Sequence, residues 1–241
     1  MIFFGVQYVR YHALLGGLPP VPPWTPGGPA VAYATGVLLI FGGVCIAIRR
    51  KARVGAALIA GVFLFCVLFL YWPRLHEVLY DGVERTRFLE PLALGGAALA
   101  LISLLSGDSG DPSGLRKPPD WLSRMGRWLF ALPMIVFGWQ HFEYARFIAT
   151  LIPKWIPAHM FWVYFTAMAF IVAALAILTE KFGRLAATWL GIMFLLWTVL
   201  LHAPRVVALR GRDEWNSAFV ALAMCGASFI VARTLPGKES T

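Results

Sequence analysis

The chain contains two copies of one sequence pattern. Residues 21–74 align without a gap with residues 152–205, so that the same residue types recur about 131 positions apart. Upstream, FGVQYVRY at residues 4–11 matches FGWQHFEY at residues 137–144. The recurring residues include Pro22/Pro153, Trp24/Trp155, Tyr33/Tyr164, Arg53/Arg184, Pro73/Pro204 and Arg74/Arg205. Solenoid repeats have periods of roughly 20–50 residues, so this longer period predicts a duplicated domain.

The composition is that of a membrane protein. Hydrophobic residues make up 59% of the chain and charged residues only 14%, against about 25% charged residues in ordinary soluble domains. The net charge of +9 comes from basic residues at the ends of apolar runs. That placement is typical of cytoplasmic loops and argues against nucleic-acid binding.

Seven apolar runs are long enough to cross a bilayer as helices. They are residues 30–48, 54–71, 88–105, 126–144, 158–178, 185–203 and 215–232. The repeat predicts an eighth span at the N-terminus, where only the last part of the pattern is present. Either the natural start lies upstream or this helix has been shortened.

The predicted fold is all-α: a polytopic membrane protein of two tandem four-helix bundles. We place the first unit at residues 1–105 and the second at residues 126–233. The segment between them, residues 106–125, is rich in Gly, Pro, Ser and charge, as loops are.

The distribution of Lys and Arg predicts the orientation. Arg49, Arg50, Lys51 and Lys181 lie at one set of helix ends, together with the basic residues of the linker. The positive-inside rule assigns these ends to the cytoplasm. Both halves then have the same orientation, unlike the inverted repeats of many transporters.

Polar residues of the second half gather at the opposite, non-cytoplasmic helix ends. Ionisable groups at this depth are costly unless paired, which makes the group a candidate ligand or proton site. The histidines could share a proton, bind a metal with a carboxylate, or hydrogen-bond a quinone; a purely structural clamp between helix ends is the alternative. The members are Gln140, His141, Glu143, Tyr144, His202, Arg205, Glu214 and Trp215.

The first half keeps most of this pattern and changes two members together. Tyr8 stands in place of His141, and Tyr71 in place of His202. The joint change suggests that the two histidines act as a unit and that their chemistry belongs to the second half alone. The retained counterparts are Gln7, Tyr11, Arg74 and, with a one-residue shift, Glu84.

The three cysteines predict no thiol chemistry. Cys45, Cys66 and Cys225 all lie in apolar runs without a Cys-x-x-Cys motif. We interpret them as small buried side chains, although a disulfide between Cys45 and Cys66 across a helical hairpin stays open.

Several motifs of the second half occur together in a known family. FGWQHFEY, PKWIP, LLHAPRV and EWNSAF, within residues 126–233, resemble the DoxX and DoxX-like four-helix bacterial membrane proteins. The first half resembles them more weakly through FGVQY, PPWTP and YWPR, and departs at Tyr8 and Tyr71. The family-like positions are Gln140, His141, His202, Pro204, Arg205, Glu214 and Trp215.

The resemblance implies a redox association. The family takes its name from a membrane subunit of a thiosulfate:quinone oxidoreductase, and some relatives are linked to thiol and oxidative-stress defence. We therefore expect a multi-pass protein of the bacterial inner membrane with a quinone site at the outer leaflet. There His141 and His202 would hydrogen-bond or protonate the quinone, with Arg205 and Glu143 setting their charge. Glu143 could pair with Arg205, or its carboxylate could exchange protons with bulk water.

Such a protein needs a partner that oxidises the substrate, because the sequence has no visible redox cofactor site. Whether the chain is itself an enzyme stays open. The alternative function is a structural or assembly subunit, or a small-lipid carrier, whose polar residues only lock the helix ends together.

Overall fold

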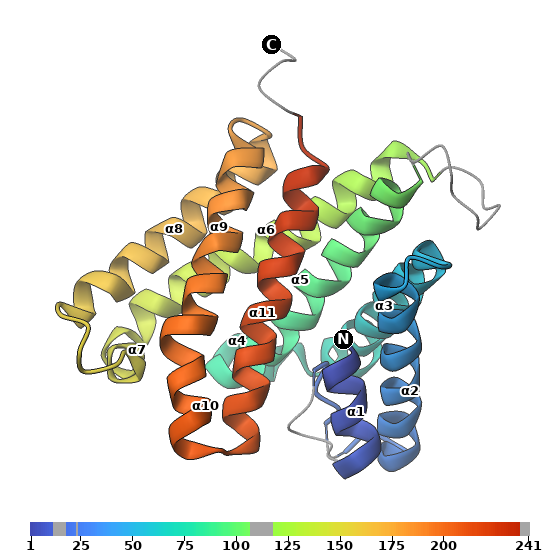
Figure 1. Cartoon of the computed structure of the whole chain (residues 1–241), viewed down its shortest axis with the longest axis horizontal. Helices are drawn as coiled ribbons and strands as arrows, with labels where there is room; N and C mark the ends of the chain where they lie inside the picture. Colours follow the sequence, from blue (N-terminus) through green and yellow to red (C-terminus); the bar gives the residue numbers. More distant parts are fainter. Residues whose placement is uncertain (12–17, 23, 107–117, 237–241) are drawn as a thin grey trace. The chain divides into compact units, whose positions relative to one another are not determined.

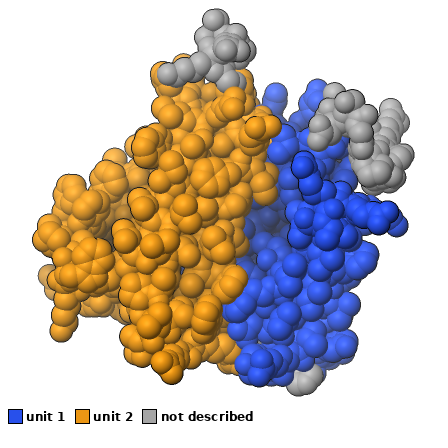
Figure 2. All heavy atoms as spheres, in the orientation of Figure 1, with its two compact units in different colours: residues 1–129 blue, residues 130–241 orange. Residues whose placement is uncertain are grey.

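The computed structural model describes residues 1–11, 18–22, 24–106 and 118–236. These residues form helices and no strand, and the chain divides into two compact units, residues 1–129 and 130–241 (Figure 2). Six helical stretches in the described part are long and apolar enough to cross a membrane, which confirms an all-α polytopic membrane protein. They are Gly28–Ala47, Ala52–Tyr80, Gly82–Leu105, His159–Thr179, Gly183–Leu209 and Arg212–Arg233.

Unit 1 is built around α3, which packs against both α2 and α5, while α1 packs on α2. Small residues allow this close packing: a Cβ placed on Gly5 of α1 would lie 2.5 Å from the carbonyl oxygen of Gly36 in α2. The α-helices are α1 (Ile2–Tyr11), α2 (Gly28–Ala47), α3 (Ala52–Phe65), α4 (Leu75–Tyr80) and α5 (Gly82–Leu105).

Unit 2 follows the same plan, with α9 packed against both α8 and α11. In Figure 1, α9 leads into α10, and the chain then turns back as α11 beside α9. A Cβ on Gly138 of α6 would lie 2.8 Å from the carbonyl oxygen of Ala167 in α8, which is the counterpart of the Gly5 contact. The α-helices are α6 (Asp120–Glu143), which begins in unit 1, α7 (Ala145–Leu151), α8 (His159–Thr179), α9 (Gly183–Trp197), α10 (Ala203–Leu209) and α11 (Arg212–Arg233).

Backbone details recur between the units at the spacing of the sequence repeat. Positive φ angles occur at Gly27 and Ala158, which precede α2 and α8. They occur again in the turns after these helices, where Arg49 and Lys51 of unit 1 correspond to Glu180 and Phe182 of unit 2. The two halves therefore share turn geometry as well as helix order.

The third helix of each unit ends in a π-helical segment. These segments are η1 (Cys66–Tyr71) and η3 (Thr198–His202). In each, the closing N–H bonds to the carbonyl five residues earlier, Trp72 to Val67 and Ala203 to Thr198. The proline that follows has no N–H to continue the α-helical pattern, and π segments of this kind often mark functional sites.

The predicted N-terminal span and the predicted span at residues 126–144 differ from the helices that form. α1 has ten residues, too few to cross the hydrocarbon. α6 has 24 residues but is not among the six candidate spans, since its ends are polar. It begins at Asp120, inside the segment predicted as a linker, because an acidic residue after two prolines favours a helix start. Residues 107–117 of that linker lie outside the described part.

Apolar side chains cover the outside of the long helices. Several of these side chains are at least half exposed: Phe41 and Phe69 in unit 1, and Val172, Trp189 and Leu196 in unit 2. Water does not tolerate so many exposed apolar groups, whereas lipid does. These surfaces indicate a lipid bilayer as the surroundings of both units.

Candidate functional site

In unit 1, the two tyrosines that replace histidines hold a loop of the same unit. The Tyr8 hydroxyl, on α1, donates a hydrogen bond to the carbonyl of Pro19, and the Tyr71 hydroxyl, at the end of η1, donates to that of Pro20 at 3.1 Å. Both tyrosines and residues 18–21 are buried. Both hydroxyls are therefore already hydrogen-bonded, to two consecutive backbone carbonyls.

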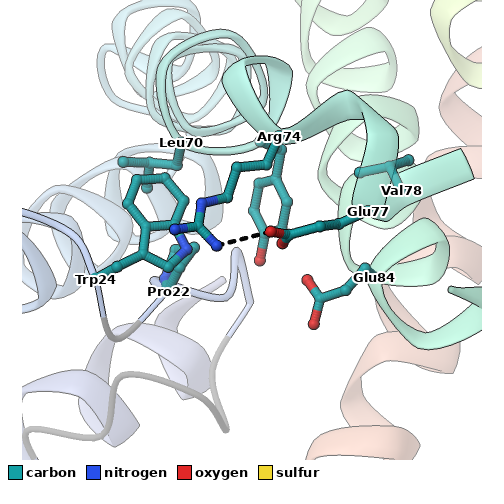
Figure 3. A pocket seen from close by; sticks show the side chains of 8 residues that line it. Pro22, Trp24, Leu70, Arg74, Glu77, Val78 and Glu84 are labelled. Atoms are coloured by element: carbon teal, nitrogen blue, oxygen red, sulfur yellow. Dashed lines mark hydrogen bonds and ion pairs between the residues drawn. The ribbon is translucent and has the colours of Figure 1, made fainter. Parts of the chain in front are cut away.

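A small recess lies beside this loop (Figure 3). The Arg74 guanidinium lies over the Trp24 ring, 4.5 Å from its centroid, and its Nη1 donates to Glu77 Oε1 at 2.8 Å. Glu84 also lines the recess and forms an ion pair with Arg87. The recess has room for about one water molecule. Unit 1 therefore closes this end with its own loop and side chains.

In unit 2, His141 on α6 is bound to its own helix and packed between aromatic rings. Its Nδ1 lies 2.8 Å from the carbonyl oxygen of Phe137, one turn earlier. The imidazole stacks on Trp197 at 6.1 Å with an interplanar angle of 19°, and meets Phe170 edge-on at 5.4 Å. No described residue hydrogen-bonds to its Nε2. The side chain is half-buried.

The rings around His141 form one aromatic cluster, which we define as Phe137, Phe170, Phe194 and Trp197. Phe170 is the central ring and contacts the other three at centroid distances of 5.6–6.1 Å. Phe170 and Phe194 are buried, whereas Trp197 is half-buried. The cluster joins α6, α8 and α9 beside the imidazole, and Phe170 meets the other three rings at interplanar angles of 52–77°.

His202 closes the π segment η3, five residues after Trp197. The ring is half-buried, and no described residue hydrogen-bonds to it. The structure therefore attaches both histidines to the same region of α9, His141 by stacking on Trp197 and His202 through the backbone. Neither imidazole hydrogen-bonds to the other.

Arg205 and Glu214 form an ion pair at this end of unit 2. Arg205 Nη2 lies 3.5 Å from Glu214 Oε1. Glu143 was one possible partner of Arg205 in the sequence; in the structure Arg205 pairs with Glu214. In unit 1, Arg74 forms its ion pair with Glu77. The matching position of unit 2 is Ala208, so Arg205 pairs with a residue of the next helix instead.

The other predicted residues lie in varied surroundings. Gln140 is buried, Glu143 is exposed, and Tyr144 precedes the first turn of α7. Trp215 is exposed and stacks on Phe219. In unit 1, Gln7 is half-buried with its Oε1 lacking a hydrogen-bond partner among the described atoms, and Tyr11 is exposed.

The sequence predicted neither the aromatic cluster nor the hydrogen bonds from Tyr8 and Tyr71 to the loop carbonyls. Trp197 carried a signal, because it precedes the histidine and proline that end the third helix. The acceptors Pro19 and Pro20 carried none, since a backbone carbonyl has no side-chain signature.

Metal and thiol chemistry find no support in the described part of the chain. No three His, Cys, Asp or Glu side chains there are grouped so as to hold a metal ion. Cys45, Cys66 and Cys225 are buried and free, so the disulfide left open between Cys45 and Cys66 is not formed.

Comparison with known proteins gives no match: no family model, no curated protein and no solved structure matches this chain.

Proposed function

We propose that unit 2 binds a quinone or its reduced form at the outer boundary of the bacterial inner membrane, with His141 and His202 as the polar contacts. The protein would serve as a membrane subunit of a redox complex, as the resemblance to the DoxX family suggests. Its first unit would be a structural copy of the same bundle.

The observation that carries the proposal is the contrast between the two units. The tyrosine hydroxyls of unit 1 donate hydrogen bonds to the carbonyls of Pro19 and Pro20. His141 Nε2 and both nitrogens of His202 have no hydrogen-bond partner among the described residues of unit 2. Half-buried polar atoms without a protein partner are available for a ligand or water.

The aromatic cluster supports a flat ring as the ligand. Ligand sites are mostly apolar and aromatic, with a few polar groups that set the orientation. Phe170 and Trp197 supply the apolar wall beside His141. A quinone headgroup combines a ring that can stack with oxygens that hydrogen-bond, and its isoprenoid tail remains in the lipid.

A partner protein would exchange electrons with the quinone. The free cysteines are buried, and a thiol relay needs paired, accessible thiols. The redox centre is therefore proposed to belong to another subunit, which reaches the outer end of unit 2.

The test is binding of a decyl-tailed benzoquinone to the full chain in lipid nanodiscs. We compare wild type with His141→Tyr/His202→Tyr, which gives unit 2 the residue pair of unit 1, and with His76→Tyr, which alters an exposed histidine of unit 1. Saturable binding that the double variant loses and the control keeps supports the proposal. Absence of binding to the wild type in both redox states of the ligand would overturn it and favour a structural subunit.

A further inference from the structure

One helix position makes different hydrogen bonds in the two units. In unit 1, Tyr8 donates its hydroxyl proton to the Pro19 carbonyl. In unit 2, the same position is His141, and its Nδ1 faces the carbonyl of Phe137. The two residues therefore present different groups to whatever lies at the end of the bundle.

The contact with Phe137 fixes which nitrogen of His141 carries the proton. A carbonyl oxygen can only accept a hydrogen bond, so at 2.8 Å the Nδ1 must be the donor. In a neutral imidazole the other nitrogen then has a bare lone pair. Nε2 is consequently an acceptor, where the Tyr8 hydroxyl of unit 1 is a donor.

The neighbouring rings keep this acceptor in place. Trp197 stacks on the imidazole, and Phe170 meets it edge-on. Turning the ring over would break the bond from Nδ1 to Phe137. His202 has no hydrogen bond that fixes its tautomer, so it can donate or accept and does not discriminate between ligands.

We infer that unit 2 takes the reduced, hydroquinone form of its ligand in preference to the quinone, because His141 requires a hydrogen-bond donor. This inference rests on the proposed function of unit 2. It concerns binding alone and assigns no electron or proton transfer.

The two redox forms differ in the group that they present. A hydroquinone offers a hydroxyl proton to Nε2 while its ring lies against the aromatic cluster. A quinone offers only carbonyl oxygens, so two lone pairs would face each other and neither would be satisfied. Losing one hydrogen bond and leaving its acceptor unpaired corresponds to at least about 10-fold weaker binding.

The test uses decyl-benzohydroquinone and decyl-benzoquinone with the full chain in nanodiscs at pH 7.5 without oxygen. Affinities are measured for wild type, His141→Gln and the control His76→Gln. The glutamine amide reaches the same place with both a donor and an acceptor, so this variant should bind the two forms about equally. We expect the wild type and the control to bind the hydroquinone at least about 10-fold more tightly.

The outcomes separate this inference from the proposed function. Equal affinity of the wild type for the two forms, or tighter binding of the quinone, overturns the inference and leaves the quinone site standing. A preference that persists in His141→Gln overturns the role of His141. If neither form binds the folded wild type, the proposed function fails as well.

Discussion

The hydrogen bonds from Tyr8 and Tyr71 to the loop of unit 1 predict different losses of stability when each hydroxyl is removed. In Tyr8→Phe the carbonyl of Pro19, which is buried, loses its donor. An unsatisfied buried acceptor costs about 1–3 kcal/mol. In Tyr71→Phe the bond to Pro20 is lost beside the recess, where a water can replace the donor. We expect the second variant to lose about 0.5–1.5 kcal/mol.

The double variant should cost less than the sum of the two single variants. Both hydroxyls bind consecutive carbonyls of one loop, so the first loss lets the loop relax and weakens the second bond. Contacting residues that share a partner are commonly non-additive by 0.5 kcal/mol or more, as an order of magnitude.

The assay is equilibrium unfolding of each variant in detergent, followed by near-ultraviolet circular dichroism. A loss of 1 kcal/mol corresponds to a midpoint lower by roughly 2–4 °C for a chain of this size. Tyr80→Phe is the control: this tyrosine at the end of α4 is 88% exposed, and the change should alter stability by less than about 0.5 kcal/mol. A Tyr8→Phe midpoint equal to that of the control would refute the hydrogen-bonded loop as a stabilising element.

Three further outcomes follow from the backbone and the packing, each measured by the same unfolding assay. Gly27→Ala should destabilise the protein by about 1 kcal/mol, and Ala158→Gly should stabilise it by up to about 1 kcal/mol. The reason is that both positions have positive φ, while the space beside Gly27 is open. A stability change of the same sign for both variants would contradict the repeated turn. Gly138→Ala should cost about 1–3 kcal/mol, since its Cβ would lie within 2.8 Å of the neighbouring helix; wild-type stability would show that α6 and α8 are not in close contact. Glu214→Gln should cost less than about 1 kcal/mol, because the side chain of its partner Arg205 is 39% exposed. A larger loss would mean that the ion pair supports the site more strongly than this exposure implies.

Much of the fold could be predicted from the sequence because lipid imposes simple rules. Apolar runs of about 20 residues have to be helical so that their backbone polar groups are satisfied. The starts of α2 and α8 follow the Pro-Trp segments of each half. Glycines in matched helices, such as Gly5 and Gly138, provide the close contacts. α6 was harder to place, because its polar ends reduce its apolar length.

The sequence suggested the residues of the candidate site but not the contacts between them. His141 and His202 were identified as a pair, yet their common neighbour Trp197 was not, because stacking depends on side-chain directions that a linear pattern does not give. Glu143 was one possible partner of Arg205, and the structure shows Glu214 in that place. Ala208, in place of Glu77, was the available sign that the pairing differs between units.

The most direct test of the central claim is photolabelling of the wild-type protein in nanodiscs with an azido-benzoquinone, followed by peptide mapping. The account predicts that the label attaches to residues 137–144 or 194–202, beside His141 and the aromatic cluster, and that excess unlabelled decyl-benzohydroquinone prevents it. Labelling confined to unit 1, or spread over the lipid-facing helices without competition, would contradict a quinone site in unit 2.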